Sequence, residues 1–164
     1  MKTTTLNNQQ GFSLIEAMIA MVILSIGLLA VGLMQIGAMK ANTNAHSRSD
    51  GVTLAQSTMD TLRSLPLNDN RLTDSDPGAV DLDDGRAVGN NAPVAANAGH
   101  KGDELFATNP IVGANGQSYT VFWNVDDNTP VIGAKTIRLF VYWTDQKFGL
   151  NRVITTSIIG GLYL

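Results

Sequence analysis

The chain of 164 residues contains no cysteine, so it has no disulfide, no thiol nucleophile and no cysteine-ligated metal. Charge is also scarce: charged residues make up 15% of the sequence, and the formal net charge is −3. This balance argues against nucleic-acid binding, which needs a basic surface. His46 and His100 are isolated among polar neighbours and indicate neither a metal site nor a catalytic pair. We therefore expect no catalytic residues, no metal and no cofactor.

The few charges are distributed unevenly, because the first 39 positions contain only Lys2 and Glu16. The 23 residues from Ala17 to Met39 carry no charge. As an α-helix they would extend about 35 Å, enough to cross a hydrocarbon core of ~30 Å. The run is longer than the apolar core of a secretory signal, and no small-x-small cleavage site follows it. Lys2 would keep the start of the chain in the cytoplasm, which places residues 40–164 beyond the inner membrane.

Glu16 is the exception in this apolar region. A charge inside hydrocarbon costs a few kcal/mol or more, so an acid in such a place is a candidate functional residue. Its carboxylate could reach the interface, because it lies near the start of the run. Alternatively, it could pair with a cation that another molecule supplies. The residues alone leave both explanations open.

The residues around Glu16 form a distinctive series. The polar segment MKTTTLNNQQ precedes Gly11, Phe12 follows it, and GFSLIE leads directly into the apolar run. This series resembles the processing site of type IV pilins and of their relatives, the type II secretion pseudopilins. The resemblance implies that a prepilin peptidase in the membrane cuts between Gly11 and Phe12 and methylates the new amine of Phe12. Glycine suits such a cut because it has no Cβ to hinder the approach of the enzyme.

The same resemblance implies a partner for Glu16. In a pilin fibre, its carboxylate would meet the methylated amine of Phe12 on an adjacent subunit. Because breaking one half of a buried pair costs about 3–5 kcal/mol, this pair could control subunit docking. The implied partners are the prepilin peptidase, other major and minor pilins, the pilus assembly platform and the inner membrane. The implied location is a single-pass inner-membrane protein with a periplasmic C-terminus, and later the pilus fibre or its tip.

Beyond the apolar run, the sequence predicts a second helical half. Apolar residues recur at helical spacing from Val52 to Leu62, and Leu65-Pro66 stops the helix. The middle, KANTNAHSRSDG, is a poor helix former, but we expect the helix to continue through it. The expected organisation is a leader, an assembly helix, an amphipathic helical half, a long variable loop and a β-meander: 1–11, 12–39, 40–65, 66–117 and 118–164.

The C-terminal third is rich in β-branched and aromatic residues, with turn-forming clusters between the richest segments. It predicts strands at 118–125 and 135–144 and from Arg152 onwards, joined as an antiparallel meander. In the middle strand, apolar groups occupy both faces, so one face should pack on the helix and the loop should partly cover the other. We expect Trp123 and Trp143 to be core or sheet-surface residues. The predicted fold class is α+β, a long N-terminal helix packed on a C-terminal antiparallel sheet, as in pilins.

The segment 67–117 is rich in Asn, Asp, Gly, Ala and Pro, and such a long loop is unusual within a compact domain. Its stretch TDSDPGAVDLDDG holds clustered carboxylates, which hard cations prefer as ligands. The spacing does not follow the EF-hand pattern, so a solvated acidic turn is favoured. Calcium binding by this loop stays open.

The expected function is that of a minor type IV pilin, most similar to minor pilins of the PilV type: a structural subunit without catalytic chemistry that enters or primes the pilus fibre. Many major pilins close a C-terminal loop with a disulfide, which this chain cannot form. One alternative is a minor pseudopilin of a type II secretion system, which shares the N-terminal motif. Another is a monomeric membrane-anchored periplasmic binding module, which predicts no leader cleavage.

Overall fold

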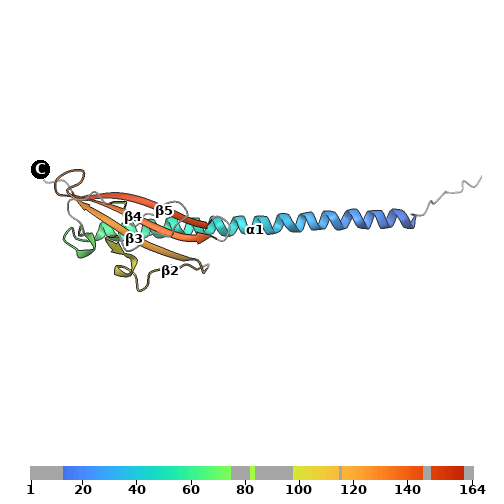
Figure 1. Ribbon diagram of the computed structural model, residues 1–164, viewed down its shortest axis with the longest axis horizontal. Coiled ribbons are helices and arrows are strands. Elements are labelled where there is room, and N and C mark those ends of the chain that lie inside the picture. Colours follow the sequence, from blue (N-terminus) through green and yellow to red (C-terminus); the bar gives the residue numbers. More distant parts are fainter. Residues whose placement is uncertain (1–12, 75–81, 84–97, 115, 146–148, 161–164) are drawn as a thin grey trace, which may run out of the picture. The chain divides into compact units, whose positions relative to one another are not determined.

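The computed structural model describes residues 13–74, 82–83, 98–114, 116–145 and 149–160. A long helix near the N-terminus and a C-terminal antiparallel sheet confirm the predicted α+β class (Figure 1). The chain divides into two compact units, residues 1–43 and residues 44–164. Each is described by itself below.

The helix α1 extends from Leu14 to Ser64 without interruption, as predicted. The poor helix formers between Lys40 and Gly51 are helical throughout. The helix ends where the sequence indicates, because a residue that precedes proline disfavours the helical conformation and Pro66 follows Leu65. The buried residues of α1 all belong to the second unit, and Ser47 is the first of them.

Three long strands form the predicted meander: β3 (Ser118–Asp127), β4 (Ala134–Asp145) and β5 (Gly149–Gly160). Two further strands, β1 (His100–Lys101) and β2 (Ile111–Val112), pair antiparallel with β3. The main order in the sheet is β1-β3-β4-β5. Two short 3₁₀ helices, η1 (Asn70–Leu72) and η3 (Gly102–Glu104), complete the described elements. The segment predicted as a loop therefore contains short elements that the sequence analysis missed.

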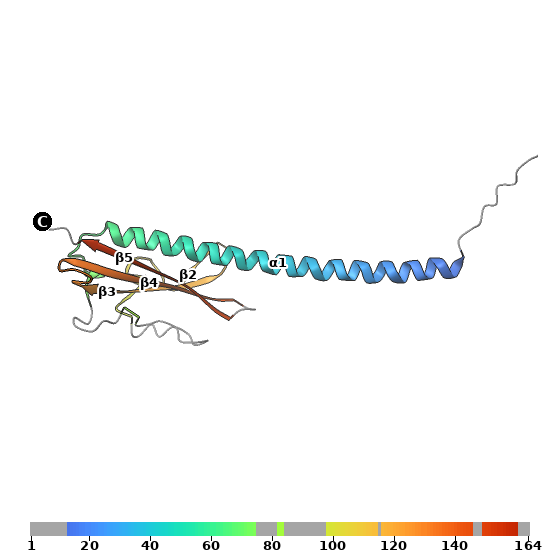
Figure 2. The same cartoon turned by 90° about the horizontal axis from the view of Figure 1, so that it is seen from above.

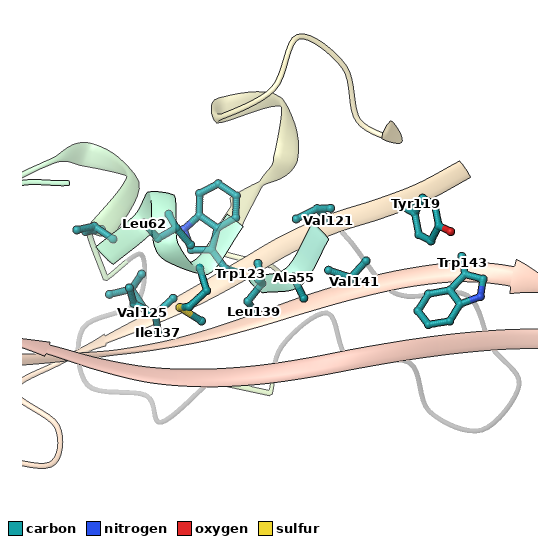
Figure 3. Close-up of a cluster of buried hydrophobic side chains, with 12 residues drawn as sticks. Ala55, Leu62, Tyr119, Val121, Trp123, Val125, Ile137, Leu139, Val141 and Trp143 are labelled. Atoms are coloured by element: carbon teal, nitrogen blue, oxygen red, sulfur yellow. The ribbon is translucent and has the colours of Figure 1, made fainter. Parts of the chain in front are cut away.

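The main core lies between one face of the sheet and the C-terminal part of α1, which runs along that face (Figure 2). Side chains of α1 face alternate residues of β3 and β4 there (Figure 3). The predicted division of β4 into two faces is confirmed: Ile137, Leu139, Val141 and Trp143 belong to this core. Trp123 and Trp143 are core residues, 0% and 3% exposed.

The prediction that Val52 belongs to the buried stripe of the helix is wrong. Ala55, Met59 and Leu62 are buried, but Val52 is 41% exposed. Its neighbour Gly51 is buried in its place, because the indole of Trp143 occupies the space beside it: a Cβ added to Gly51 would lie 2.9 Å from Trp143 Cζ3. The absence of a side chain at Gly51 thus leaves room for the indole of Trp143 beside the helix.

The opposite face of the sheet carries a smaller aromatic cluster. Phe122 stacks on Phe140 and on Tyr142, with ring centroids 5.4 and 5.3 Å apart. Ala98 and Leu150 pack against these rings, and Leu82 accepts a hydrogen bond from Asn124 above the same face. The loop therefore contributes to this face, as the sequence predicted.

Candidate assembly site

The first part of α1 is apolar on every side. All of its large apolar side chains between Leu14 and Met39 are more than half exposed. Its most apolar window has a mean hydropathy of 2.6, and none of it is buried within the protein. By length and composition, α1 is the one described helix that could cross a membrane. Such a surface requires a cover of lipid or of other helices, because a helix that is hydrophobic all round is normally buried.

Two hydroxyl groups of the first unit bond to carbonyl groups of the helix itself. The hydroxyl of Ser25 donates to the carbonyl of Met21 at 2.7 Å, and that of Thr43 donates to the carbonyl of Met39 at 3.1 Å. Such bonds to the preceding turn allow serine and threonine to lie in an apolar medium. Among the described residues 13–39, Glu16 is the only charged side chain.

Glu16 lies in the first turn of α1, where Ser13 precedes the helix. The backbone N–H of Glu16 donates to Ser13 Oγ at 3.4 Å and to the Ser13 carbonyl at 3.1 Å. Serine is a favoured N-cap because its hydroxyl satisfies an N–H that the helix leaves free. The sequence Ser13-Leu14-Ile15-Glu16 also has the spacing of a capping box. This cap was not predicted, although the spacing of Ser13 and Glu16 indicates it.

The cap gives Glu16 a second possible role within one chain. A carboxylate in the first helical turn interacts favourably with the positive end of the helix dipole, typically by about 0.3–1 kcal/mol. The side chain is exposed, so it remains accessible to a cation from another molecule. The predicted cleavage residues Gly11 and Phe12 lie outside the described residues, and their roles stay predictions.

The acidic turn is only partly described. Asp76, Asp81 and Asp84 lie outside the described residues, whereas Asp83 forms an ion pair with Arg138. No group of three or more histidine or acidic side chains that could hold a metal occurs in the part of the chain that the structure describes. The question of a calcium site in this loop therefore gains no support from the residues seen.

His100 differs from the expectation of an isolated histidine. It is buried, its Nδ1 lies 2.8 Å from Glu104 Oε2, and its Nε2 lies 2.8 Å from the carbonyl oxygen of Thr73. The ring also stacks on Trp123 at a centroid distance of 5.5 Å. The spacing of His100 and Glu104, four residues apart, was a signal for this pair, but the contact with Thr73 could not be seen in the sequence.

A second ionic contact lies next to this one. Asp69 caps η1 and receives hydrogen bonds from the guanidinium of Arg71 and from the Arg71 backbone N–H. These bonds, the guanidinium first, lower the pKa of Asp69 to about 2. The pair lies in the turn that follows the end of α1.

Comparison with known proteins adds one finding. Residues 6–32 match the family model described as the prokaryotic N-terminal methylation motif, a range that includes Gly11, Phe12 and Glu16. No match was found among curated proteins or among solved structures. The motif match and the apolar helix together support a membrane-anchored precursor of the type IV pilin or pseudopilin kind.

Proposed function

We propose that this protein is a minor type IV pilin, a structural subunit that prepilin peptidase processes and that then enters or primes a pilus fibre. The observation that carries the proposal is the methylation motif at residues 6–32, continuous with an apolar helix whose side chains find no cover within the protein. In this proposal residues 1–11 are the leader, 12–39 the assembly helix and 40–65 its amphipathic continuation. Residues 66–117 and 118–164 form the exposed domain of the subunit.

Processing would create the cation that Glu16 lacks. Cleavage after Gly11 leaves Phe12 with a free amine, which stays positively charged after methylation. The amine of one subunit and the Glu16 carboxylate of the next would then pair between apolar helices. In that medium of low dielectric an unpaired charge is costly, so the pair favours a subunit that docks in the correct register.

The Ser13 cap makes this proposal more specific. If Glu16 only stabilised the helix start, it would act through the Ser13 turn, and losing that cap would have a comparable effect. If Glu16 acts between subunits, its charge matters and the cap matters much less. The two roles can be separated because Glu16→Gln removes the charge but keeps the shape, whereas Ser13→Ala removes the cap hydroxyl and keeps the charge.

The test is expression of the full chain with prepilin peptidase in cells that assemble pili, with two measurements. The mass of the membrane-bound protein should show an N-terminus at methylated Phe12 for the wild type and for the three variants Glu16→Gln, Glu16→Asp and Ser13→Ala. Immunoblots of sheared fibres should then show strong loss of Glu16→Gln, with Ser13→Ala and Glu16→Asp retained much better.

Other outcomes of the same measurements would contradict the proposal. A wild-type chain that keeps residue 1, or an unmethylated Phe12, would support the membrane-anchored binding module instead. Equal losses for Ser13→Ala and Glu16→Gln would assign Glu16 a role within its own helix. Because the motif is shared with pseudopilins, deletion of the gene distinguishes the two assemblies: loss of surface fibres and twitching supports a pilin, and loss of exoprotein secretion supports a pseudopilin.

A further inference from the structure

Three consecutive carbonyl groups at the end of η1 are held by side chains of the sheet. The carbonyl of Arg71 accepts from Trp123 Nε1 at 2.8 Å, that of Leu72 from Lys135 Nζ at 2.9 Å, and that of Thr73 faces His100 Nε2 at 2.8 Å. Leu72 itself is fully buried between these contacts. The three donors come from β3, β4 and β1, so η1 is fastened to the sheet at three successive residues.

The two contacts of the His100 ring constrain which of its nitrogens carry a proton. A neutral imidazole has one N–H and one lone pair. The carbonyl of Thr73 can only accept, and an ionised Glu104 can only accept as well. Both ring nitrogens of His100 therefore face acceptors, and the two short contacts require an N–H on each nitrogen.

Glu104 is itself arranged as an acceptor. Its second oxygen, Oε1, accepts from the backbone N–H of Lys101 at 2.9 Å. Its side chain is 36% exposed, whereas that of His100 is 9% exposed, so water can reach the pair from the carboxylate side. The geometry points to a folded state in which His100 is an imidazolium paired with Glu104, so that fastening η1 to the sheet takes up a proton from solvent.

The charges around the pair come from every neighbouring element. On η1, Arg71 attracts Glu104 and is itself paired with Asp69, and Asp74 follows Thr73. The charges nearest in sequence on β1 and η3, those of Lys101 and Asp103, are exposed. On the sheet, Lys135 pairs with Asp127 and binds the neighbouring carbonyl of Leu72. Two ion pairs, Arg71–Asp69 and Lys135–Asp127, thus accompany the His100–Glu104 contact on the neighbouring elements.

The sign of the effect follows from linkage. A folded state that binds one more proton than the unfolded state loses stability as the pH rises. When the proton is lost, a lone pair of His100 faces either the carboxylate or the Thr73 carbonyl, and one of the contacts becomes repulsive. The attachment of η1 therefore weakens in alkaline solution and is firmest in mildly acidic solution, whatever assembly the protein joins.

The test uses the full chain in detergent micelles with His46→Gln as the background, so that His100 is the single histidine. Urea unfolding is followed by the fluorescence of Trp123 and Trp143, both in the second unit. In this background the unfolding constant should rise as the pH is raised, by at most about tenfold per pH unit. Adding Glu104→Gln should remove most of that slope, because the glutamine amide can donate to a neutral ring and still accept from Lys101.

Equal slopes with and without Glu104→Gln would overturn the inference. A second measurement on the wild type does not depend on a variant that folds. With ¹⁵N-labelled histidine, His100 of the folded protein should show a proton on both ring nitrogens at neutral pH. A folded protein in which His100 shows one protonated ring nitrogen at that pH would also overturn the inference.

Discussion

The substitution Gly51→Ala tests the packing between α1 and the sheet, because it adds one methyl group where the two meet. A Cβ at this position would lie 2.9, 3.2 and 3.3 Å from three carbons of the Trp143 ring. Carbon atoms pack best at about 3.5–4.0 Å, so the added methyl and the indole overlap. The indole has little freedom to move: Trp143 is 3% exposed and packs on Tyr119 at a centroid distance of 5.8 Å.

Two effects of Gly51→Ala oppose each other. In an open helical position, alanine is more favourable than glycine by about 1 kcal/mol. Overpacking a core that is already filled costs about 1–3 kcal/mol. The overlap should prevail here, because Tyr119, which holds the indole in place, donates its own hydroxyl proton to the Ser47 carbonyl one turn earlier on α1. We expect a net loss of about 1 kcal/mol, equivalent to a melting temperature lower by about 3–5 °C.

The matched control is the same substitution in a Trp143→Phe background, where the smaller ring leaves room for the methyl group. There, Gly51→Ala should stabilise the protein by up to about 1 kcal/mol, so the double-mutant cycle should give a coupling of about 2 kcal/mol. Urea unfolding of the full chain, followed by tryptophan fluorescence, measures all four proteins, because Trp123 is present in each of them. A stabilised Gly51→Ala single variant, or additive effects, would refute the claim that Trp143 requires glycine at this position.

Two further predictions concern polar groups of the second unit. The hydroxyl of Ser157 is buried without a hydrogen-bond partner, so Ser157→Ala should stabilise the protein by about 1 kcal/mol in the same urea assay. Thr136→Val is its control and should destabilise the protein, because the Thr136 hydroxyl donates to the Thr129 carbonyl at 2.6 Å. The lowered pKa of Asp69 contributes stability that is present above about pH 4 and is lost as the pH falls through about 2. Asp69→Asn should therefore show a shallower loss of stability between these pH values, and an unchanged acid profile would contradict the role of its pair with Arg71.

The elements that the sequence predicted correctly are those with a long periodic or compositional signal. The helix to Ser64 carries an apolar run and a helical stripe, and the strands β3, β4 and β5 are rich in β-branched and aromatic residues. Each signal covers eight or more residues, so local exceptions such as the poor helix formers near Thr43 did not outweigh it. Tertiary packing of the second helical half supplies the stability that its propensity lacks.

The features that the sequence analysis missed depend on contacts between distant residues. The strands β1 and β2 have two residues each, too few for an alternating pattern, and they exist because β3 offers them a pairing edge. The burial of Gly51 in place of Val52 is set by a tryptophan of β4. Likewise, the surroundings of His100 include Thr73 and Trp123, which lie far from it in sequence.

The two units differ in whether the described carboxylates have a partner within the chain. In the second unit, described carboxylates such as Asp69, Asp83 and Glu104 have cationic or ring N–H partners within the same chain. In the first unit Glu16 has neighbours that satisfy its backbone, but the chain supplies no cation beside it among residues 13–39. A carboxylate that stays solvated at a membrane surface needs no partner, but one that enters a bundle of apolar helices does. If the protein is the proposed pilin, assembly is therefore the step at which the charge of Glu16 becomes decisive, and we expect its loss to be seen in the fibre and not in the fold of the isolated subunit.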